Sequence, residues 1–85
     1  MEKEFHLRVM TADGTALDRQ VVSLRIPMKE GSIGILANHA PMLCRVSKGK
    51  LTARSADGEE IVFPLREGVA NVRNNTVTIL TFGNE

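Results

Sequence analysis

The chain has 85 residues, of which 42% are hydrophobic and 25% charged, proportions that are ordinary for a globular protein. A chain this short has no room for a second hydrophobic core, so we expect a single domain spanning residues 1–85. Eleven Lys and Arg against ten Asp and Glu leave a formal charge of +1. The basic residues are scattered along the sequence, with Lys48, Lys50 and Arg54 as the nearest approach to a cluster. The chain has three Phe and no Trp or Tyr, so the composition argues against a nucleic-acid partner, which needs a basic surface or aromatic stacking faces.

The single cysteine, Cys44, excludes a disulfide within the chain. Because Leu43 stands beside it, we predict a small buried side chain in a protein of a reducing compartment. The N-terminal residues hold no apolar run long enough for a secretory signal, and no stretch approaches the ~20 apolar residues of a membrane helix. We therefore expect a soluble, cytoplasmic protein that does not insert into lipid but can still dock on a membrane complex.

Apolar and polar residues alternate along most of the chain, which is the period of a β-strand. The alternation predicts strands over residues 5–10, 21–26, 32–36, 42–47, 51–54, 61–65, 69–73 and 76–82. Turn signals, whose residues accept positive φ readily, separate several of these strands: Asp13-Gly14, Asp57-Gly58 and Asn74-Asn75. No window shows the apolar stripe of a helix. Eight to ten short strands predict an all-β fold, an antiparallel sandwich or barrel, and apolar residues on both faces of several strands favour two stacked sheets.

Candidate catalytic and metal-binding residues do not converge in the sequence. His6 lies on the polar face of a predicted strand, where solvent satisfies it, and one cysteine with two distant histidines cannot supply a zinc site. The Glu59-Glu60 pair follows a turn, where solvated acids are usual. The glycine-rich run at residues 31–34 lacks the Gly-Lys-Ser/Thr ending of a phosphate loop. We therefore expect a binding or structural protein with no catalytic residue, no metal and no cofactor.

The segment from Glu30 to Pro41, EGSIGILANHAP, departs furthest from plain alternation. It resembles the E-G-x-x-G-I-x-x-x-H-A-P segment of the epsilon subunit of F-type ATP synthases, called delta in mitochondria. Other segments resemble the strands and the central hairpin of that subunit's N-terminal domain: FHLRVMTADG, VVSLRIP, KGKLTARSADGEE and NVRNNTVTIL. The resemblance covers nearly the whole chain at consistent spacing.

The resemblance implies a flattened, antiparallel β-sandwich of about ten short strands in the central stalk of the synthase. It implies a non-catalytic subunit that couples the gamma subunit to the membrane c-ring during rotary, ion-driven ATP synthesis. The protein would then be peripheral, at the cytoplasmic face of a bacterial inner membrane. Such a role needs stiffness and complementary surfaces and no catalytic group, which agrees with the residues themselves.

The resemblance carries two sets of contact residues to this chain. The set that faces gamma comprises Met10, Thr11, His39, Ala40 and Cys44. The set that faces the c-ring comprises Glu30, Gly31 and Ser32. The residues themselves leave alternatives open: a histidine ring after a tight turn can lie on a partner and donate one hydrogen bond, but it can equally cap the turn before Pro41. Cys44 can equally be a core residue.

The chain departs from the family pattern at several positions. Ser32 stands where most relatives have an acid, which leaves Glu30 as the carboxylate available to the ring. Ala37-Asn38 replaces the usual Pro-Gly, and Asn38 can supply the left-handed backbone that the corner needs. Glu67-Gly68 replaces Gly-Gly. Most bacterial and chloroplast relatives continue into a C-terminal helical hairpin that can inhibit ATP hydrolysis, and since this sequence ends at Glu85 we expect no inhibitory arm.

An alternative of another class is a free-standing β-sandwich that binds a small molecule. That function predicts a deep pocket lined by Ile33, Leu36 and Met42, because small-molecule sites are concave and largely apolar. The coupling role predicts instead a broad exposed face.

Overall fold

A computed structural model of the chain describes residues 3–82. Within these residues the chain forms nine β-strands and no helix, so no helix of the described part is available to span a bilayer. The strands are β1 Phe5–Thr11, β2 Gly14–Val21, β3 Ser23–Met28, β4 Gly31–Leu36, β5 Met42–Val46, β6 Gly49–Arg54, β7 Glu60–Leu65, β8 Gly68–Arg73 and β9 Thr76–Thr81. The expectation about an inhibitory arm at the C-terminus lies outside the described residues.

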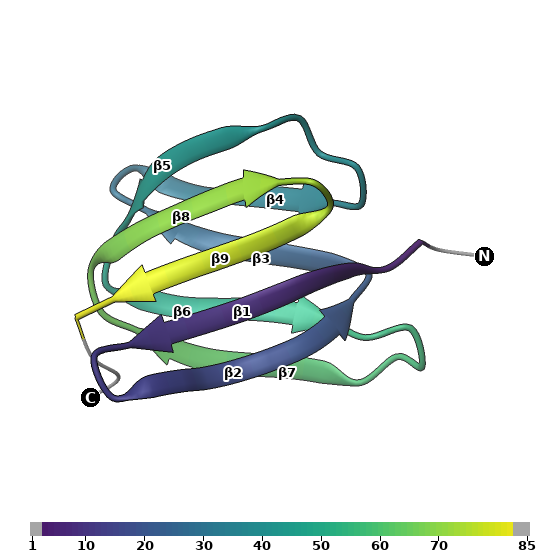
Figure 1. The fold of residues 1–85 in the computed structure, drawn as a ribbon, viewed down its shortest axis with the longest axis horizontal. Helices are drawn as coiled ribbons and strands as arrows, with labels where there is room; N and C mark the ends of the chain where they lie inside the picture. The colour runs from purple at the N-terminus through teal and green to yellow at the C-terminus, as the bar shows by residue number, and fades with distance from the viewer. Residues whose placement is uncertain (1–2, 83–85) are drawn as a thin grey trace.

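The strands form two sheets that stack face to face, which confirms the predicted all-β sandwich (Figure 1). One sheet has five strands in the order β2-β1-β9-β8-β5, and the other has four in the order β4-β3-β6-β7. Every pair is antiparallel except β1–β9, which is parallel and places Met10 opposite Leu80. The sequence predicted an antiparallel sandwich, so this one parallel pair was not predicted. Successive strands reverse direction along the sandwich, so the first and ninth strands run the same way and must pair in parallel where they meet.

The core lies between the sheets and is filled by the inward half of each alternating strand. Its largest fully buried side chains are aliphatic: Leu7, Ile26, Ile35, Leu51 and Ile79. Removing a side chain of this size from water contributes roughly 1.5–3 kcal/mol. Because successive residues of a strand point to opposite faces, the other half of each strand is left for the two outer surfaces.

One strand was missed by the alternation pattern, and another was assigned wrongly. The pattern predicts a single strand over residues 21–26, with Val21 and Val22 on opposite faces. Instead β2 ends at Val21 and β3 begins at Ser23, and both valines are buried. The chain crosses between the sheets here, and the Val22 N–H donates to the Arg54 carbonyl oxygen at 2.7 Å. The alternation misses β2 because this edge strand is mostly polar and largely solvated.

The connections gather at the two ends of the sandwich. We call the left end in Figure 1 the turn end: it holds the β1–β2, β3–β4, β5–β6 and β7–β8 connections. The right end, the loop end, holds the β2–β3, β4–β5, β6–β7 and β8–β9 connections. At the loop end Asn38, Asn74 and Asn75 have φ of 63°, 52° and 59°. The left-handed backbone expected at these asparagines is therefore present.

Candidate interaction surfaces

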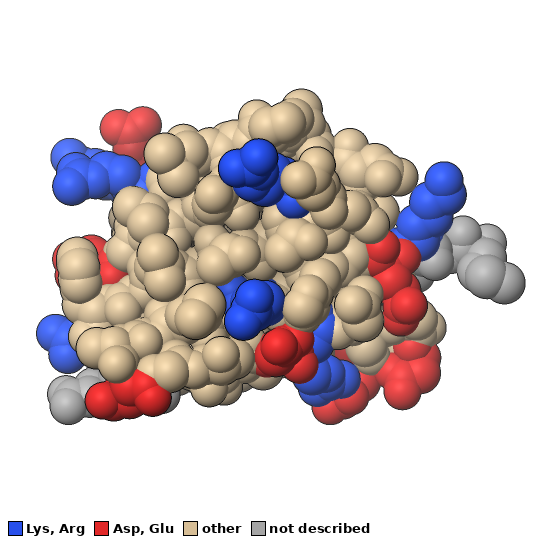
Figure 2. Space-filling view, in the orientation of Figure 1, with Lys and Arg blue, Asp and Glu red and all other residues tan. Residues whose placement is uncertain are grey.

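The outer surface of the five-stranded sheet exposes large apolar side chains. We define the apolar face as Met10, Leu43, Val69 and Leu80. The ladder places Leu80 between Met10 on β1 and Val69 on β8, so three of the four share one row across the sheet. Leu43 is 73% exposed, Leu80 52% and Val69 40%. Figure 2 views this surface and shows uncharged residues across much of it, interrupted by isolated basic groups.

One charged cluster borders the apolar face on β1 and β2. His6, which the sequence suggested is simply solvated, contacts the Asp18 carboxylate through Nε2, and the Nε of Arg8 lies 3.8 Å from the same carboxylate. These three side chains project from the outer side of the same two strands, where register pairs Arg8 with Asp18. The cluster bounds the apolar face with one carboxylate between two basic side chains, and the buried Nε of Arg8 has no hydrogen-bond partner among the described residues.

The structure does not bring together the five residues assigned to the gamma-facing set. Met10 belongs to the apolar face, and Thr11 follows it at the turn end of β1. Cys44 pairs with the buried Ala70 and packs partly against the core, on the opposite side of β5 from Leu43. It is half-buried rather than fully buried as predicted, and this burial raises the pKa of its thiol.

His39 and Ala40 lie at the loop end, across the length of the strands from Met10 and Thr11 (Figure 1). The His39 Nδ1–H donates to the Ala40 carbonyl oxygen at 2.8 Å, which is the local capping role left open by the sequence. Asn75 holds this corner from the β8–β9 turn: its Oδ1 accepts the Asn38 N–H at 2.7 Å, and its Nδ2 donates to the Glu4 carbonyl oxygen at 2.9 Å. His39 therefore stands in a fixed corner beside, and not within, the apolar face.

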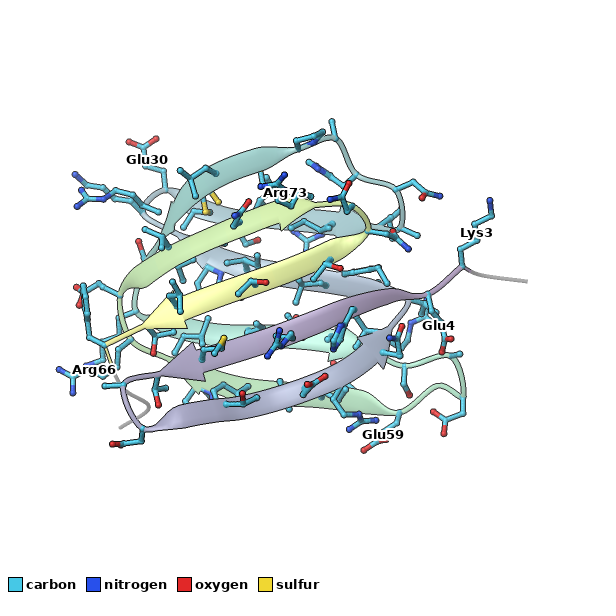
Figure 3. All side chains as sticks on the ribbon, in the orientation of Figure 1. Lys3, Glu4, Glu30, Glu59, Arg66 and Arg73 are labelled. Carbon is cyan, nitrogen blue, oxygen red and sulfur yellow. The ribbon has the colours of Figure 1, made fainter. Side chains whose placement is uncertain are left out.

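The three residues assigned to the c-ring lie together in the β3–β4 hairpin at the turn end. Figure 3 labels Glu30 there, with its carboxylate in solvent. Gly31 has φ of 124°, and no atom lies within 4 Å of a Cβ added to it. A residue with a side chain would be strained there by its backbone, not by crowding. Ser32 is exposed, and its Oγ accepts a hydrogen bond from Arg25 Nη1 at 3.0 Å.

The described residues contain no group of three or more His, Cys, Asp or Glu side chains that could hold a metal ion. The Glu59-Glu60 pair also separates, because Glu59 pairs with Arg19, whose Nη2 lies 2.9 Å from Glu59 Oε1. Glu60 begins β7 opposite Arg54.

Two open hollows lie on the outer surfaces. One, of about 590 Å³, runs over β3, β4 and β6 and is lined by residues that include Arg25, Gly34, Leu36 and Arg54. The other, of about 410 Å³, lies over β5 and β8 beside Pro41 and Met42. Neither combines the three residues expected of a small-molecule pocket: Ile33 and Met42 pack against the core while Leu36 is 64% exposed. The small-molecule alternative is not favoured.

Sequence reasoning missed Leu43, Val69 and Leu80 as surface residues. Their signal was present, since each stands on the side of its strand opposite a neighbour that is buried or half-buried. Alternation alone does not say which strands have both sides covered, so the sequence could not show that this side of the sheet faces solvent. Arg25 was missed for the same reason, since its contact with Ser32 depends on the pairing of β3 with β4.

An all-β sandwich that exposes large apolar side chains on one outer face has the features of a protein-interaction module. The family model described as ATP synthase, Delta/Epsilon chain, beta-sandwich domain matches residues 4–83, and the chain belongs to this family. The chain is 38% identical over 77 residues to the chloroplastic ATP synthase epsilon chain of Cyanidioschyzon merolae, covering 91% of this chain and 58% of that relative. It thus spans little more than half the length of this curated relative.

Two solved structures share the fold. A chain in the Euglena gracilis mitochondrial ATP synthase, in a structure described as OSCP/F1/c-ring, superposes with a TM-score of 0.87 at 24% identity, covering 94% of this chain and 51% of that one. A chain in the central stalk/c-ring structure of the Tetrahymena thermophila mitochondrial ATP synthase superposes with a TM-score of 0.77 at 18% identity, covering 96% and 66%. At these identities the likeness shows the sandwich fold.

Proposed function

We propose that the chain is a non-catalytic part of the central stalk of an F-type ATP synthase, where it couples the gamma subunit to the membrane c-ring. The apolar face carries this proposal. An antiparallel sheet whose outer side meets only water is normally polar on that side, whereas this one exposes Leu43, Val69 and Leu80. A contiguous exposed apolar surface marks an interface. Family membership indicates which complex supplies the partner.

The gamma subunit is the proposed occupant of the apolar face. Met10 lies within the face, and Thr11 follows it at the turn end, on the other side of β1 and within the β1–β2 turn. His39 and Ala40 bound the contact at the loop end, where Asn75 fixes their corner. Cys44 supports the face from below by packing between β5 and the core. This arrangement keeps the five residues that the family resemblance suggests, but gives contact energy chiefly to the apolar residues that the resemblance did not name.

The c-ring is the proposed partner of the turn end, through Glu30, Gly31 and Ser32. The descriptions of both similar structures include a c-ring, and one also names the central stalk. We assign the chain to the periphery of the membrane sector, at the cytoplasmic face of a bacterial inner membrane. No cofactor, metal, nucleic acid or inserted lipid has a part in this function.

In this role the gamma subunit and the c-ring bind to one stiff β-sandwich. Both sheets share a single core of close-packed aliphatic side chains, and such interiors have low compressibility and transmit strain. A force applied by the ring at the turn end therefore reaches the apolar face without the sheets sliding. The chain need not bind nucleotide for this role.

Co-purification tests the proposal. The full chain is mixed with the gamma subunit and with the detergent-solubilised c-ring from the same source, first singly and then together, at low salt. We expect a binary complex with gamma and a ternary complex when the ring is added. A chain that binds neither partner, alone or in the mixture, would falsify the proposed function.

A further inference from the structure

The turn end carries a cluster of cations that the sequence does not reveal. We define the basic corner as Arg25, Lys29, Lys48 and Lys50. We propose that this corner binds an acidic polypeptide loop, with a carboxylate of the loop taken by the Arg25 guanidinium that Ser32 holds in place. The inference rests on the proposed function only for the identity of the loop, which is then the polar loop of the c-ring subunit.

Backbone pairing brings the four cations together. Arg25 lies in the middle of β3 opposite Thr52, midway between Lys50 and Arg54 on the same side of β6. Its guanidinium reaches toward the turn end, where it binds Ser32 beside Pro27. The Ser47 N–H donates to the Pro27 carbonyl oxygen at 3.0 Å, which holds the β5–β6 turn, and Lys48 with it, against the end of β3. Lys29 belongs to the neighbouring β3–β4 turn.

The corner is cationic in a chain that is nearly neutral. All four side chains are exposed, and no ion pair joins any of them to another described residue. Glu30 is the one carboxylate in these two turns. Because the whole chain has a formal charge of only +1, the rest of the molecule is net negative. The positive charge therefore favours an anionic partner at this corner, whereas the other two turns of the turn end carry Asp13 and Glu67.

Arg25 is held in a shape that suits a carboxylate. Its Nη1 donates to Ser32 Oγ at 3.0 Å. A Cβ at Gly34 would lie 3.1 Å from Arg25 Nη2, so glycine leaves the room in which the guanidinium lies against β4. A planar guanidinium binds a carboxylate through two parallel hydrogen bonds, and one already fixed loses less rotamer freedom on binding. Ser32 is thus a positioning residue and not the contact itself.

The shape of the corner favours a protruding loop over a flat membrane. Glu30 stands in the β3–β4 turn, whereas Arg25 lies behind it on the sheet, at the margin of the open hollow over β3, β4 and β6. A flat anionic surface at this end would meet the exposed Glu30 carboxylate together with Lys29, so like-charge repulsion would offset part of the attraction. A loop can pass Gly31, which presents no side chain, and place its carboxylate beside Arg25. Glu60 also lines this hollow, but at its other end, opposite Arg54.

A blocked tetraglutamate peptide is the probe, titrated into the isotope-labelled chain at low salt and followed by NMR. We expect shifts at Gly31, Ser32, Gly34 and the Arg25 Nε–H, with weakening as salt is added. Arg25→Gln should raise the dissociation constant about fivefold, the scale of one exposed ion pair. The matched control Arg73→Gln removes the same charge from β8 at the loop end and should leave binding unchanged (Figure 3).

Ser32→Asp separates positioning from contact. An aspartate at this position would take Arg25 for itself, so peptide binding should fall to the level of Arg25→Gln while the thermal unfolding midpoint is kept. Unchanged peptide binding in Ser32→Asp, or equal weakening in Arg73→Gln, overturns the proposal. Binding to phosphatidylglycerol vesicles without binding to the peptide also overturns it, because the corner would then recognise lipid.

Ring binding then distinguishes this inference from the proposed function. If the natural chain binds the c-ring and Arg25→Gln binds it equally well, the inference fails and the function stands. If the natural chain binds neither gamma nor the ring, the function fails whatever the peptide does. We expect the natural chain to bind the ring and Arg25→Gln to bind it about fivefold more weakly at low salt.

Discussion

The two outer surfaces of the sandwich offer a partner different physics, although both cover the same core. The five-stranded sheet presents the apolar face, where affinity comes from area removed from water and depends little on salt. The four-stranded sheet presents Arg25 with Lys50, beside a hollow, where attraction is electrostatic and screened within about 8–10 Å at ordinary ionic strength. In the proposed function, the apolar face would supply most of the binding energy, and the charged surface would orient its partner.

This difference resides entirely in the outward half of each strand. The inward residues of β8 and β3, such as Val72 and Ile26, are equally apolar and equally buried. Exchanging outward residues would change the partner and leave the fold intact, since the two sets point to opposite sides of each strand. Substitutions on one surface that leave the other unchanged can therefore test this difference.

The largest effect should come from adding a methyl group beneath the apolar face. In Gly68→Ala the new Cβ would lie 1.9 Å from the Leu80 carbonyl oxygen. Because the β9 backbone can move away only at a high cost in energy, we expect the free energy of unfolding to fall by about 3 kcal/mol or more, as measured by urea denaturation. Gly34→Ala on the other sheet is the control, because its new methyl meets only the far end of the Arg25 side chain and no backbone atom, and it should cost less than about 1 kcal/mol. Similar losses in both variants would contradict the argument that crowding against the backbone makes the position in the five-stranded sheet the less tolerant one.

The next largest effect should be on binding to the gamma subunit, which substitutions on the two sheets should change differently. Leu80→Glu places a charge in the apolar face and should weaken gamma binding at least tenfold, about 1.4 kcal/mol, in a calorimetric titration. Val62→Glu is the matched control: Val62 is 53% exposed on β7, and Leu80 is 52% exposed on β9. It should leave gamma binding unchanged. An equal loss in both variants would show that gamma does not select the five-stranded sheet.

A smaller effect should follow from freeing the His39 corner. Asn75→Gly keeps a residue that tolerates the φ of 59° but removes the side-chain hydrogen bonds to Asn38 and Glu4. We expect a loss of about 1 kcal/mol in stability and faster hydrogen exchange at the Asn38 amide. Asn74→Gly, at a φ of 52°, is the control. If it speeds exchange at Asn38 as much, the corner is not held by the Asn75 side chain.

The smallest effect concerns acid and the β6–β7 turn of the four-stranded sheet. The Ser55 hydroxyl donates to the Asp57 carboxylate, and the Glu59 N–H adds a second hydrogen bond at 3.2 Å. These bonds lower the pKa of Asp57 from its ordinary 3.8, the Ser55 bond first. The folded state thus prefers the charged form, so the stabilisation is complete above pH 3.8 and disappears as the pH falls through the lower folded pKa.

An NMR titration of the Asp57 carboxyl carbon measures this directly. We expect its midpoint below 3.8 in the natural chain and a rise toward 3.8 in Ser55→Ala. Asp57→Asn should remove the corresponding acid-induced loss of stability. A midpoint at or above 3.8 in the natural chain would show that the turn does not favour the carboxylate.

Alternation and turn chemistry predicted most of the strands because both depend on neighbours in sequence. Phe5, Leu7 and Val9 are buried as their spacing indicates, and Asn74 and Asn75 adopt the left-handed backbone that asparagine tolerates. β2 escaped prediction because an edge strand with a solvated side carries little apolar signal. The crossing between the sheets at Val21 and Val22 was not predicted either. It buries two successive residues and therefore interrupts the two-residue period of a strand.

The site was less predictable than the fold. The segment EGSIGILANHAP indicated the family, yet it did not show that His39 and Met10 lie at opposite ends of the strands. Nor did it show that Ser32 is already engaged by Arg25. Both facts depend on which strands pair and in what register, which no local pattern states.

The sequence by itself determined the all-β class, the main turns and membership of the epsilon family, since these depend on side-chain period, backbone tolerance and motif spacing. Only the tertiary structure decided which residues become surfaces. Lys48, Lys50 and Arg54 looked like the nearest cluster along the chain, but Arg54 ends β6 at the loop end. Lys29 and the guanidinium of Arg25, which reaches from mid-β3 to Ser32, join the two lysines toward the turn end. The physical reason is that strand pairing places residues side by side that are distant in sequence, and the charge a partner meets is set by that placement.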